Sequence, residues 1–402
     1  METVLFIPGF FGFGSFGAAA AAAAPAAAGP AAATTAAAAA GAATAAAPAA
    51  SDPAASARAA AAPSSPGGGA RRPLIEYFAH VEEALARALP RPMRFVVHQP
   101  PPTGALDERV RSLHQTFLQT EGLVHLVGHS AGGLDARLFA NARYNSPAKP
   151  LFARLGAVIT LSAPFFGTPL ARRLLLGADL AMPALWFASI LASRRKLQLA
   201  GHAGAVFNAL KRLALQKTTP TDQLIAALAD VDDETAHQIR RFLLDVSRDH
   251  PLVADILPES MTSLHREVAD ADFPRIHSFV TVAPKPGFGP RDALALVTAP
   301  AQRLLYDTTY ALCAARAPAQ ARLPVGPWVS ADRLPLGPES SDGIVPTWSQ
   351  TLDGRAAGLV VGDHLDVIGH YETAGATFLR SGSNFDDARF QALWSLVAQA
   401  LR

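Results

Sequence analysis

A turn of small residues constrains the fold of this chain more than any other feature of its sequence. The pentapeptide Gly-His-Ser-Ala-Gly at 128–132 follows an apolar run at 123–127 and precedes a helical apolar pattern at 131–144. A serine between a buried strand and a helix sits on a tight, strained turn, and small neighbours let other backbone approach it. We therefore predict that Ser130 is a nucleophile near a helix N-terminus, where amides and the helix dipole favour negative charge. The alternative is an ordinary glycine turn.

Strands and helices alternate along much of the chain. Short apolar runs predict strands, and apolar residues at helical spacing predict helices. The predicted strands are 4–7, 95–98, 123–127, 155–161, 276–282 and 359–361, and the predicted helices are 74–89, 106–121 and 131–144. Such alternation is typical of α/β proteins. We therefore predict a mostly parallel central sheet flanked by helices.

Two segments depart from this alternation. Residues 18–70 consist mainly of Ala, Pro, Gly, Ser and Thr, and they lack the large side chains of a packed core, so we predict a low-complexity, flexible insert. Residues 170–268 show helical patterns without a convincing strand, which predicts a helical cap over the strand ends. The predicted organisation is a first strand and loop at 1–17, the insert at 18–70, core with the serine turn at 71–169, the cap or lid at 170–270 and further core at 271–402.

Charge and cysteine content exclude several kinds of partner. The net charge is only +2, so the chain has no basic surplus with which to neutralise nucleic acid phosphates. The single cysteine, Cys313, excludes a disulfide within the chain and a thiolate metal cluster. A G-x-G-x-x-G pattern at 12–17 is followed by the alanine-rich insert, and the first acid after it is Asp52. A dinucleotide site needs a helix there and an acid about 20 residues on, so we do not predict one.

The sequence predicts neither a leader nor a stable transmembrane anchor. A secretory signal needs basic residues and a long apolar stretch, whereas the first charged residue here is the acid Glu2 and the apolar run at 4–7 is only four residues long and stops before Pro8. Residues 174–192 are mostly apolar, but Asp179 and Pro183 interrupt them. We therefore predict a mobile or buried cap element at 174–192 and a cytoplasmic location.

A nucleophilic serine needs a base, and the base needs an orienting acid. In folds with such a turn, the acid and then the histidine follow the serine along the chain. His364 comes after a predicted strand and is our choice of base, with His370 as the alternative. Asp342 lies in a glycine-containing turn and is our choice of acid. A purely structural turn aspartate is the other interpretation of Asp342.

Two further aspartates, Asp332 and Asp353, remain possible as the acid. Asp363 precedes His364 directly and cannot easily reach round to its ring.

The tetrahedral oxyanion also needs donors. We predict the backbone amide of Ala131, directly after the nucleophile, and that of Phe10, in the glycine-containing loop after the first strand.

Five segments together resemble the bacterial triacylglycerol lipases of the α/β-hydrolase superfamily, notably those of the Pseudomonas and Burkholderia type. Pro8-Gly9-Phe10-Phe11-Gly12-Phe13 looks like the family's oxyanion loop, and Gly128-His129-Ser130-Ala131-Gly132-Gly133 looks like its serine turn. Ser162-Ala163-Pro164-Phe165-Phe166-Gly167-Thr168 looks like its Ala-Pro-His-x-Gly segment. Ser341-Asp342-Gly343-Ile344-Val345 looks like its acid turn, and Asp363-His364-Leu365-Asp366 looks like its histidine loop. The resemblance covers most of the chain outside 18–70. It implies an α/β-hydrolase fold, ester hydrolysis by Ser130, Asp342 and His364, and an interfacially mobile lid, for which 174–192 is the candidate.

The chain departs from this family in two places. Pro8 stands where the family usually has a histidine in its oxyanion loop. Many members bind a structural calcium through the aspartate two residues after the histidine, which is Asp366 here. No partner acid has matching spacing, and His370 stands near the position of a glutamine ligand. Calcium is therefore an open expectation with Asp366 as the only candidate ligand, and we expect that the reaction requires no cofactor.

These features together predict a serine-dependent carboxylic ester hydrolase, a lipase whose substrate is an acyl-chain ester or lipid, met at a lipid–water interface. Other interpretations within the fold are an intracellular polyester depolymerase, a thioesterase or a phospholipase, because pocket shape separates these and the sequence does not reveal it. A catalytically inactive α/β-hydrolase scaffold that binds an apolar ligand or partner is the alternative outside enzymes.

Overall fold

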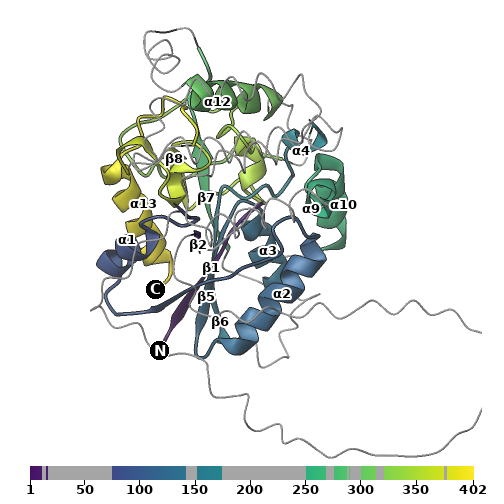
Figure 1. Cartoon of the computed structure of the whole chain (residues 1–402), viewed down its shortest axis with the longest axis vertical. Helices are drawn as coiled ribbons and strands as arrows, with labels where there is room; N and C mark the ends of the chain where they lie inside the picture. Colours follow the sequence, from purple (N-terminus) through teal and green to yellow (C-terminus); the bar gives the residue numbers. More distant parts are fainter. Residues whose placement is uncertain are drawn as a thin grey trace, which may run out of the picture. The chain divides into compact units, whose positions relative to one another are not determined.

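Six parallel strands form the central sheet of the computed structural model (Figure 1). In spatial order they are β4 (Arg94–Val97), β1 (Thr3–Ile7), β5 (Val124–His129), β6 (Leu155–Leu161), β7 (Ile276–Val282) and β8 (Gly358–Val361). Each strand is parallel to its neighbours, so all six end at the same edge of the sheet. A separate antiparallel pair consists of β2 (Ser15–Phe16) and β3 (Ile75–Glu76).

The structure describes residues 1–10, 15–16, 75–141, 152–173, 250–268, 276–287, 289, 300–313, 321–374 and 378–402. They belong to one unit, Met1–Gly17 and Leu74–Arg402. The predicted insert at 18–70 and the predicted lid at 174–192 lie outside the described residues.

Helices cover both faces of the sheet. On one face, α1 (Val81–Ala88) and α13 (Asp387–Ala400) share a core with the strands, and on the other face α2 (Leu106–Gln119) and α3 (Ala131–Ala140) do so (Figure 1). Strand β1 shows the alternation that this requires, since Val4 and Phe6 belong to the first core and Leu5 and Ile7 to the second. Because the strands are buried along most of their length, polar functional groups are left to lie at the strand ends.

Most of the predicted elements are confirmed, and β6 and β7 have the predicted bounds. The predicted helix at 74–89 is wrong in its first half, because Ile75–Glu76 is a strand and α1 begins only at Val81. Tyr77 and Phe78 are buried there, and His80 has a φ of 61°, which a helix cannot contain. Helices α12 (Pro300–Cys313) and α13 are absent from the predictions above.

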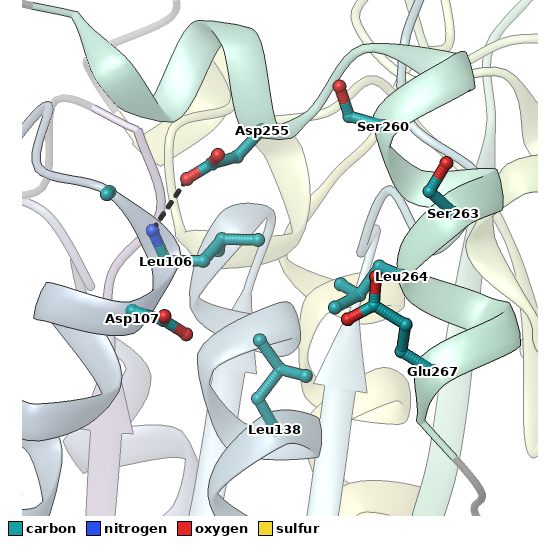
Figure 2. A pocket seen from close by; sticks show the side chains of 9 residues that line it. Leu106, Asp107, Leu138, Asp255, Ser260, Ser263, Leu264 and Glu267 are labelled. Carbon is teal, nitrogen blue, oxygen red and sulfur yellow. Dashed lines mark hydrogen bonds between the residues drawn. The ribbon is translucent and has the colours of Figure 1, made fainter.

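Three helices of the predicted cap region are described: α4 (Leu170–Arg173), α9 (Pro251–Asp255) and α10 (Pro258–Glu267). Asp255 of α9 accepts a hydrogen bond of 2.8 Å from the backbone N–H of Leu106 (Figure 2). Because α2 has no capping side chain of its own at Ala105, this carboxylate supplies its N-terminal cap. None of the helices among the described residues has the length and apolarity that a membrane crossing requires.

The strand order and the sharp turn after β5 define the fold class. A parallel sheet covered on both faces, with a strained serine turn between its third strand in space and the following helix, is the α/β-hydrolase fold. The predicted fold class is therefore confirmed.

Candidate active site

The turn at Ser130 joins the end of β5 to the start of α3. Ser130 has a φ of 55° and a ψ of −130°, a strained backbone conformation for a residue with a side chain. Its N–H donates to the carbonyl of Leu161, at the end of β6, over 2.9 Å. A Cβ built on Gly132 would overlap the carbonyl oxygen of Ile7, at the end of β1. The strained turn is therefore held between two strand ends, and the glycine permits this close approach.

The loop after β1, residues 8–10, lies against this turn, and we call it the oxyanion loop after the role that the sequence predicts for it. A Cβ built on Gly9 would come within 2.6 Å of the Cβ of Ser130. Phe10 is half-buried and packs against the cores on both faces of the sheet. Phe10 follows the residue that touches Ser130, and Ala131 follows Ser130 itself as the first residue of α3. The structure thus brings both predicted amide donors to the serine turn.

A buried ion pair holds the oxyanion loop at Pro8. Arg109 and Asp135 are both fully buried, and Arg109 Nη2 lies 2.6 Å from Asp135 Oδ2. The same Nη2 donates to the carbonyl of Pro8 over 2.8 Å. Burial raises the pKa of the Asp135 carboxyl, and the guanidinium opposes that rise. Removal of either partner would leave the other charge buried and unpaired, which lowers the free energy of unfolding by about 3–5 kcal/mol. The pair therefore fixes the loop.

Asp342 and His364 lie together beyond the ends of β7 and β8. His364 Nδ1 is 2.8 Å from Asp342 Oδ2, and the backbone N–H of His364 donates to the carbonyl of Asp342 over 3.0 Å. Both side chains are buried. A carboxylate oxygen only accepts hydrogen bonds, so Nδ1 carries the imidazole proton and Nε2 is left as the basic nitrogen.

Further hydrogen bonds hold the carboxylate of Asp342. Its Oδ1 accepts from the backbone N–H of Ile344 over 2.9 Å and of Val345 over 2.7 Å. Its Oδ2 accepts from the Thr281 hydroxyl over 2.7 Å and from the Gln350 amide over 3.1 Å. The carboxylate is therefore oriented from several sides at once, as an acid that orients a histidine must be.

The other residues that the sequence left open have different partners. His370 Nε2 lies 2.8 Å from the carbonyl of Tyr77. Asp332 and Asp353 are exposed and form ion pairs with arginines. The Asp363 carboxylate accepts from backbone N–H groups of its own turn. Among these candidates, the structure joins only Asp342 to the ring of His364.

His129 connects the serine turn to the histidine. Its Nε2 lies 2.8 Å from the carbonyl oxygen of His364, and the centroids of the two rings are 4.6 Å apart. The predicted nucleophile, base, acid and oxyanion loop thus form one cluster of loops at the carboxyl edge of the sheet. This is the edge at which the fold places its catalytic groups.

Several polar residues that support this cluster carry almost no local signal in the sequence, and they are Tyr77, Arg109, His129, Thr281 and Gln350. Most of them meet partners far away along the chain; Thr281 and Asp342 are 61 positions apart. Arg109 is the exception, because it falls at helical spacing with Leu106 and Leu113 on the apolar face of α2. A charge on an apolar face indicates a buried partner.

The surroundings of Asp366 do not fit the calcium ion that the family resemblance offers. Its Oδ2 accepts from the N–H of Asp363 over 2.8 Å and from the Ser383 hydroxyl over 2.9 Å. Burial, followed by the charge of Asp363, raises the pKa of Asp366 well above its ordinary range. Calcium prefers several anionic and carbonyl oxygens, whereas this oxygen faces two donors. In the part of the chain that is described, no three acidic, histidine or cysteine side chains gather around a metal position.

A pocket of about 440 Å³ opens between α2, α3, α9 and α10 (Figure 2). Leucine, serine and acidic side chains line it, and its lining residues are Ala105, Leu106, Asp107, Leu138, Asp255, Ser260, Ser263, Leu264 and Glu267. None of the cluster around Ser130 belongs to this lining. The pocket is therefore separate from the candidate active site.

No protein-family model and no curated protein matches this sequence. Among solved structures, the chain is similar to lipase 1 from Pelosinus fermentans, with 14% identity, 99% of this chain and 98% of that chain covered, and a TM-score of 0.43. EstA from Clostridium botulinum is 15% identical, with 99% of this chain and 87% of that chain covered and a TM-score of 0.44. The Staphylococcus hyicus lipase is 11% identical, with 99% of this chain and 94% of that chain covered and a TM-score of 0.44. The fold class therefore rests on the strand order and the serine turn of this chain.

Proposed function

We propose that this chain is a serine-dependent carboxylic ester hydrolase, a lipase that acts on acyl-chain esters through an acyl-enzyme. The observation that carries the proposal is the hydrogen bond of 2.8 Å between His364 Nδ1 and Asp342 Oδ2, in the same cluster of loops as the strained turn of Ser130. Serine, histidine and a buried acid in these roles are the parts of a hydrolase triad.

In the first step, Ser130 Oγ attacks the ester carbonyl and His364 Nε2 takes its proton. The ring is ready for this role because the bond to Asp342 keeps the other proton on Nδ1. The negative carboxylate then stabilises the imidazolium that forms.

The charge that develops on the carbonyl oxygen needs donors in place before the reaction begins. We assign this role to the backbone amides of Phe10 and Ala131. The first amides of a helix have no acceptor within it, and Ala131 opens α3. His364 then gives its proton to the departing alcohol, and water, activated by the same nitrogen, releases the acid from Ser130.

The substrate class comes from the predicted cap. Its apolar segment at 174–192 suits an acyl chain of some length better than a small polar ester, and it lies outside the described residues. Hydrolysis at a lipid–water interface is part of the proposal on the same ground.

The test compares wild type with Ser130→Ala on p-nitrophenyl esters from acetate to palmitate. We expect hydrolysis by wild type, best with the longer chains, and a loss of at least about 10⁴-fold in Ser130→Ala. Equal rates for the two proteins would end the serine-hydrolase assignment, and an absence of hydrolysis by wild type would instead favour a scaffold that binds without catalysis. A profile that peaks at acetate would indicate an esterase for small substrates and contradict the lipase assignment.

Two histidine variants test the base. We expect His364→Ala to lose activity as Ser130→Ala does, and His370→Ala to retain most of it, since the His370 ring faces the carbonyl of Tyr77. The reverse result would move the role of base to His370. A sharp rise in rate above the solubility limit of the substrate would support interfacial opening of the lid.

A further inference from the structure

Two buried side chains lie between the loops of the candidate active site and take no part in the proposed chemistry. Tyr77 is 3% exposed and His129 is 0% exposed. His129 is the residue before the nucleophile, and Tyr77 lies in the stretch between β3 and α1. Their polar atoms contact the oxyanion loop, each other and the backbone of the catalytic histidine.

Each proton in this chain of contacts can be assigned. The carbonyl of His364 only accepts, so His129 Nε2 carries a proton and donates it over 2.8 Å. His129 Nδ1 is then an acceptor, and the Tyr77 hydroxyl donates to it over 2.8 Å. The Tyr77 oxygen in turn accepts from the backbone N–H of Gly9 over 2.8 Å. The hydrogen bonds therefore run in one direction from Gly9 through Tyr77 to His129, and His129 donates onward to His364.

Burial keeps both groups neutral, which preserves this direction. It lowers the pKa of His129 well below its ordinary value, with the neighbouring His364 adding to the effect, and it raises the pKa of Tyr77. A protonated His129 could not accept from Tyr77. The network is therefore one fixed arrangement of donors and acceptors over the pH range in which a neutral His364 can act as base.

The network links three groups that must keep their relative positions during catalysis. The N–H of Gly9 places the oxyanion loop, His129 adjoins Ser130 in the chain, and the carbonyl of His364 belongs to the proposed base. A displacement of about 1 Å at reacting groups can cost about 100-fold in rate. We propose that Tyr77 and His129 are positioning residues that set the oxyanion loop, the nucleophile and the base relative to one another. This inference rests on the proposed ester hydrolase function.

The first test is Tyr77→Phe, which removes the hydroxyl and keeps the ring that packs on Phe78 at 5.0 Å between centroids. We expect kcat to fall about 10- to 100-fold while KM stays within about twofold, because the alignment of the reacting groups is lost and the binding surface is not. The matched control is Tyr371→Phe. Tyr371 is equally buried, and its hydroxyl donates to Asp387 over 3.1 Å, away from these loops.

Two variants of His129 separate the two ends of the network. The amide nitrogen of Gln can take the place of Nε2 and donate to the His364 carbonyl, whereas the amide oxygen of Asn can take the place of Nδ1 and accept from Tyr77. We expect His129→Asn to lower kcat because it frees the histidine loop. We expect Tyr77→Phe to cost less in the His129→Gln background than in wild type, because the bond between the two side chains is already lost there.

The outcomes separate this inference from the proposed function. An active wild type with an inactive Ser130→Ala supports the hydrolase; if Tyr77→Phe then has wild-type kcat, or if Tyr371→Phe loses as much kcat, the positioning role is wrong and the hydrolase stands. Equal thermal stability of the two tyrosine variants with a loss of kcat only in Tyr77→Phe supports the inference. A wild type that hydrolyses no ester overturns both.

Discussion

The two halves of the sheet edge hold their parts of the candidate active site in different ways. In the half formed by β4, β1 and β5, backbone lies against backbone: a Cβ on Gly132, two residues after Ser130 with its φ of 55°, would overlap the carbonyl oxygen of Ile7. In the half formed by β7 and β8, side chains surround the acid, and Asp342 accepts from Thr281 over 2.7 Å and from Gln350 over 3.1 Å.

This difference predicts which substitutions each half tolerates. Close backbone packing leaves no room, so the glycines of the serine turn should tolerate no added atoms, although this half also depends on the hydrogen bonds of Tyr77 and Arg109. A carboxylate held by donors should be damaged chiefly by their removal. We call these the serine half and the acid half of the edge, and the predictions below test whether they differ in this way.

The largest effect is expected in the acid half, from Asp342→Asn. The amide has nearly the shape of the carboxylate but carries no charge, and it can turn a donor toward His364 Nδ1 and favour the wrong tautomer. We expect kcat on a p-nitrophenyl ester to fall about 10³- to 10⁴-fold, with little change in melting temperature.

Exposed aspartates supply the control for this variant. Asp332→Asn and Asp353→Asn alter the acids that the sequence left open, and both side chains lie in exposed ion pairs. They should keep wild-type kcat. A loss in either that matches Asp342→Asn would show that the acid has been assigned to the wrong turn.

In the serine half, Gly132→Ala should be the most damaging addition of a single methyl group. Helix propensity alone favours alanine by about 1 kcal/mol at this position in α3. The new Cβ would, however, overlap the Ile7 carbonyl oxygen, and backbone cannot move aside cheaply. We therefore expect a net loss of about 3 kcal/mol or more in the free energy of unfolding, measured by urea denaturation.

Gly337→Ala is the matched addition outside the serine half, because a Cβ there would meet nothing within 4 Å. It should leave the free energy of unfolding within about 0.5 kcal/mol of wild type. Equal stability of Gly132→Ala and Gly337→Ala would show that the serine turn is less tightly packed than the structure indicates.

A proton is also an addition that the serine half should resist. His98 follows β4, is 2% exposed and lies 2.9 Å from the Thr116 hydroxyl through Nδ1. Burial, followed by the charge of Arg109, lowers the pKa of His98 to about 3. The unfolded chain therefore binds a proton below about pH 6.5 that the folded chain refuses, so stability is lost as the pH falls.

We expect this one group to remove about 2 kcal/mol of stability between pH 7 and pH 5. The variant His98→Asn can keep the hydrogen bond to Thr116 and cannot take up the proton. Urea denaturation at several pH values should show a shallower acid dependence for the variant. Parallel curves for the two proteins would mean that His98 takes up its proton as readily in the folded chain as in the unfolded chain.

The sequence predicts each half only in part. The strands, the strained turn at Ser130 and the pairing of Asp342 with His364 could be predicted because each lies in a local pattern, such as a small-residue turn or an acid before glycine. The hydrogen bonds that orient them could not, since Thr281 meets Asp342 from 61 positions away. The helix predicted at 74–89 failed for a related reason: burial of Tyr77 and Phe78 overrides helical spacing there.

The smallest effect is expected from Thr281→Val, which removes one hydrogen-bond donor from the acid half. Valine keeps the shape of threonine and removes the hydroxyl that donates to Asp342 Oδ2 over 2.7 Å. The backbone N–H groups of Ile344 and Val345 remain on Oδ1, so the carboxylate should turn only slightly. We expect kcat to fall by about tenfold, which corresponds to about 1.4 kcal/mol, the size of one hydrogen bond.

Thr160→Val distinguishes orientation of the acid from general damage to the core. The Thr160 hydroxyl is equally buried and donates to the Ser278 hydroxyl over 3.2 Å, without contact to Asp342. Both variants should lose about 1 kcal/mol of stability, but only Thr281→Val should lose kcat. If the two lose kcat equally, the acid half responds to core stability and not to the donors around its carboxylate, and the contrast with the serine half disappears. If only Thr281→Val does, the acid is held by individual hydrogen bonds.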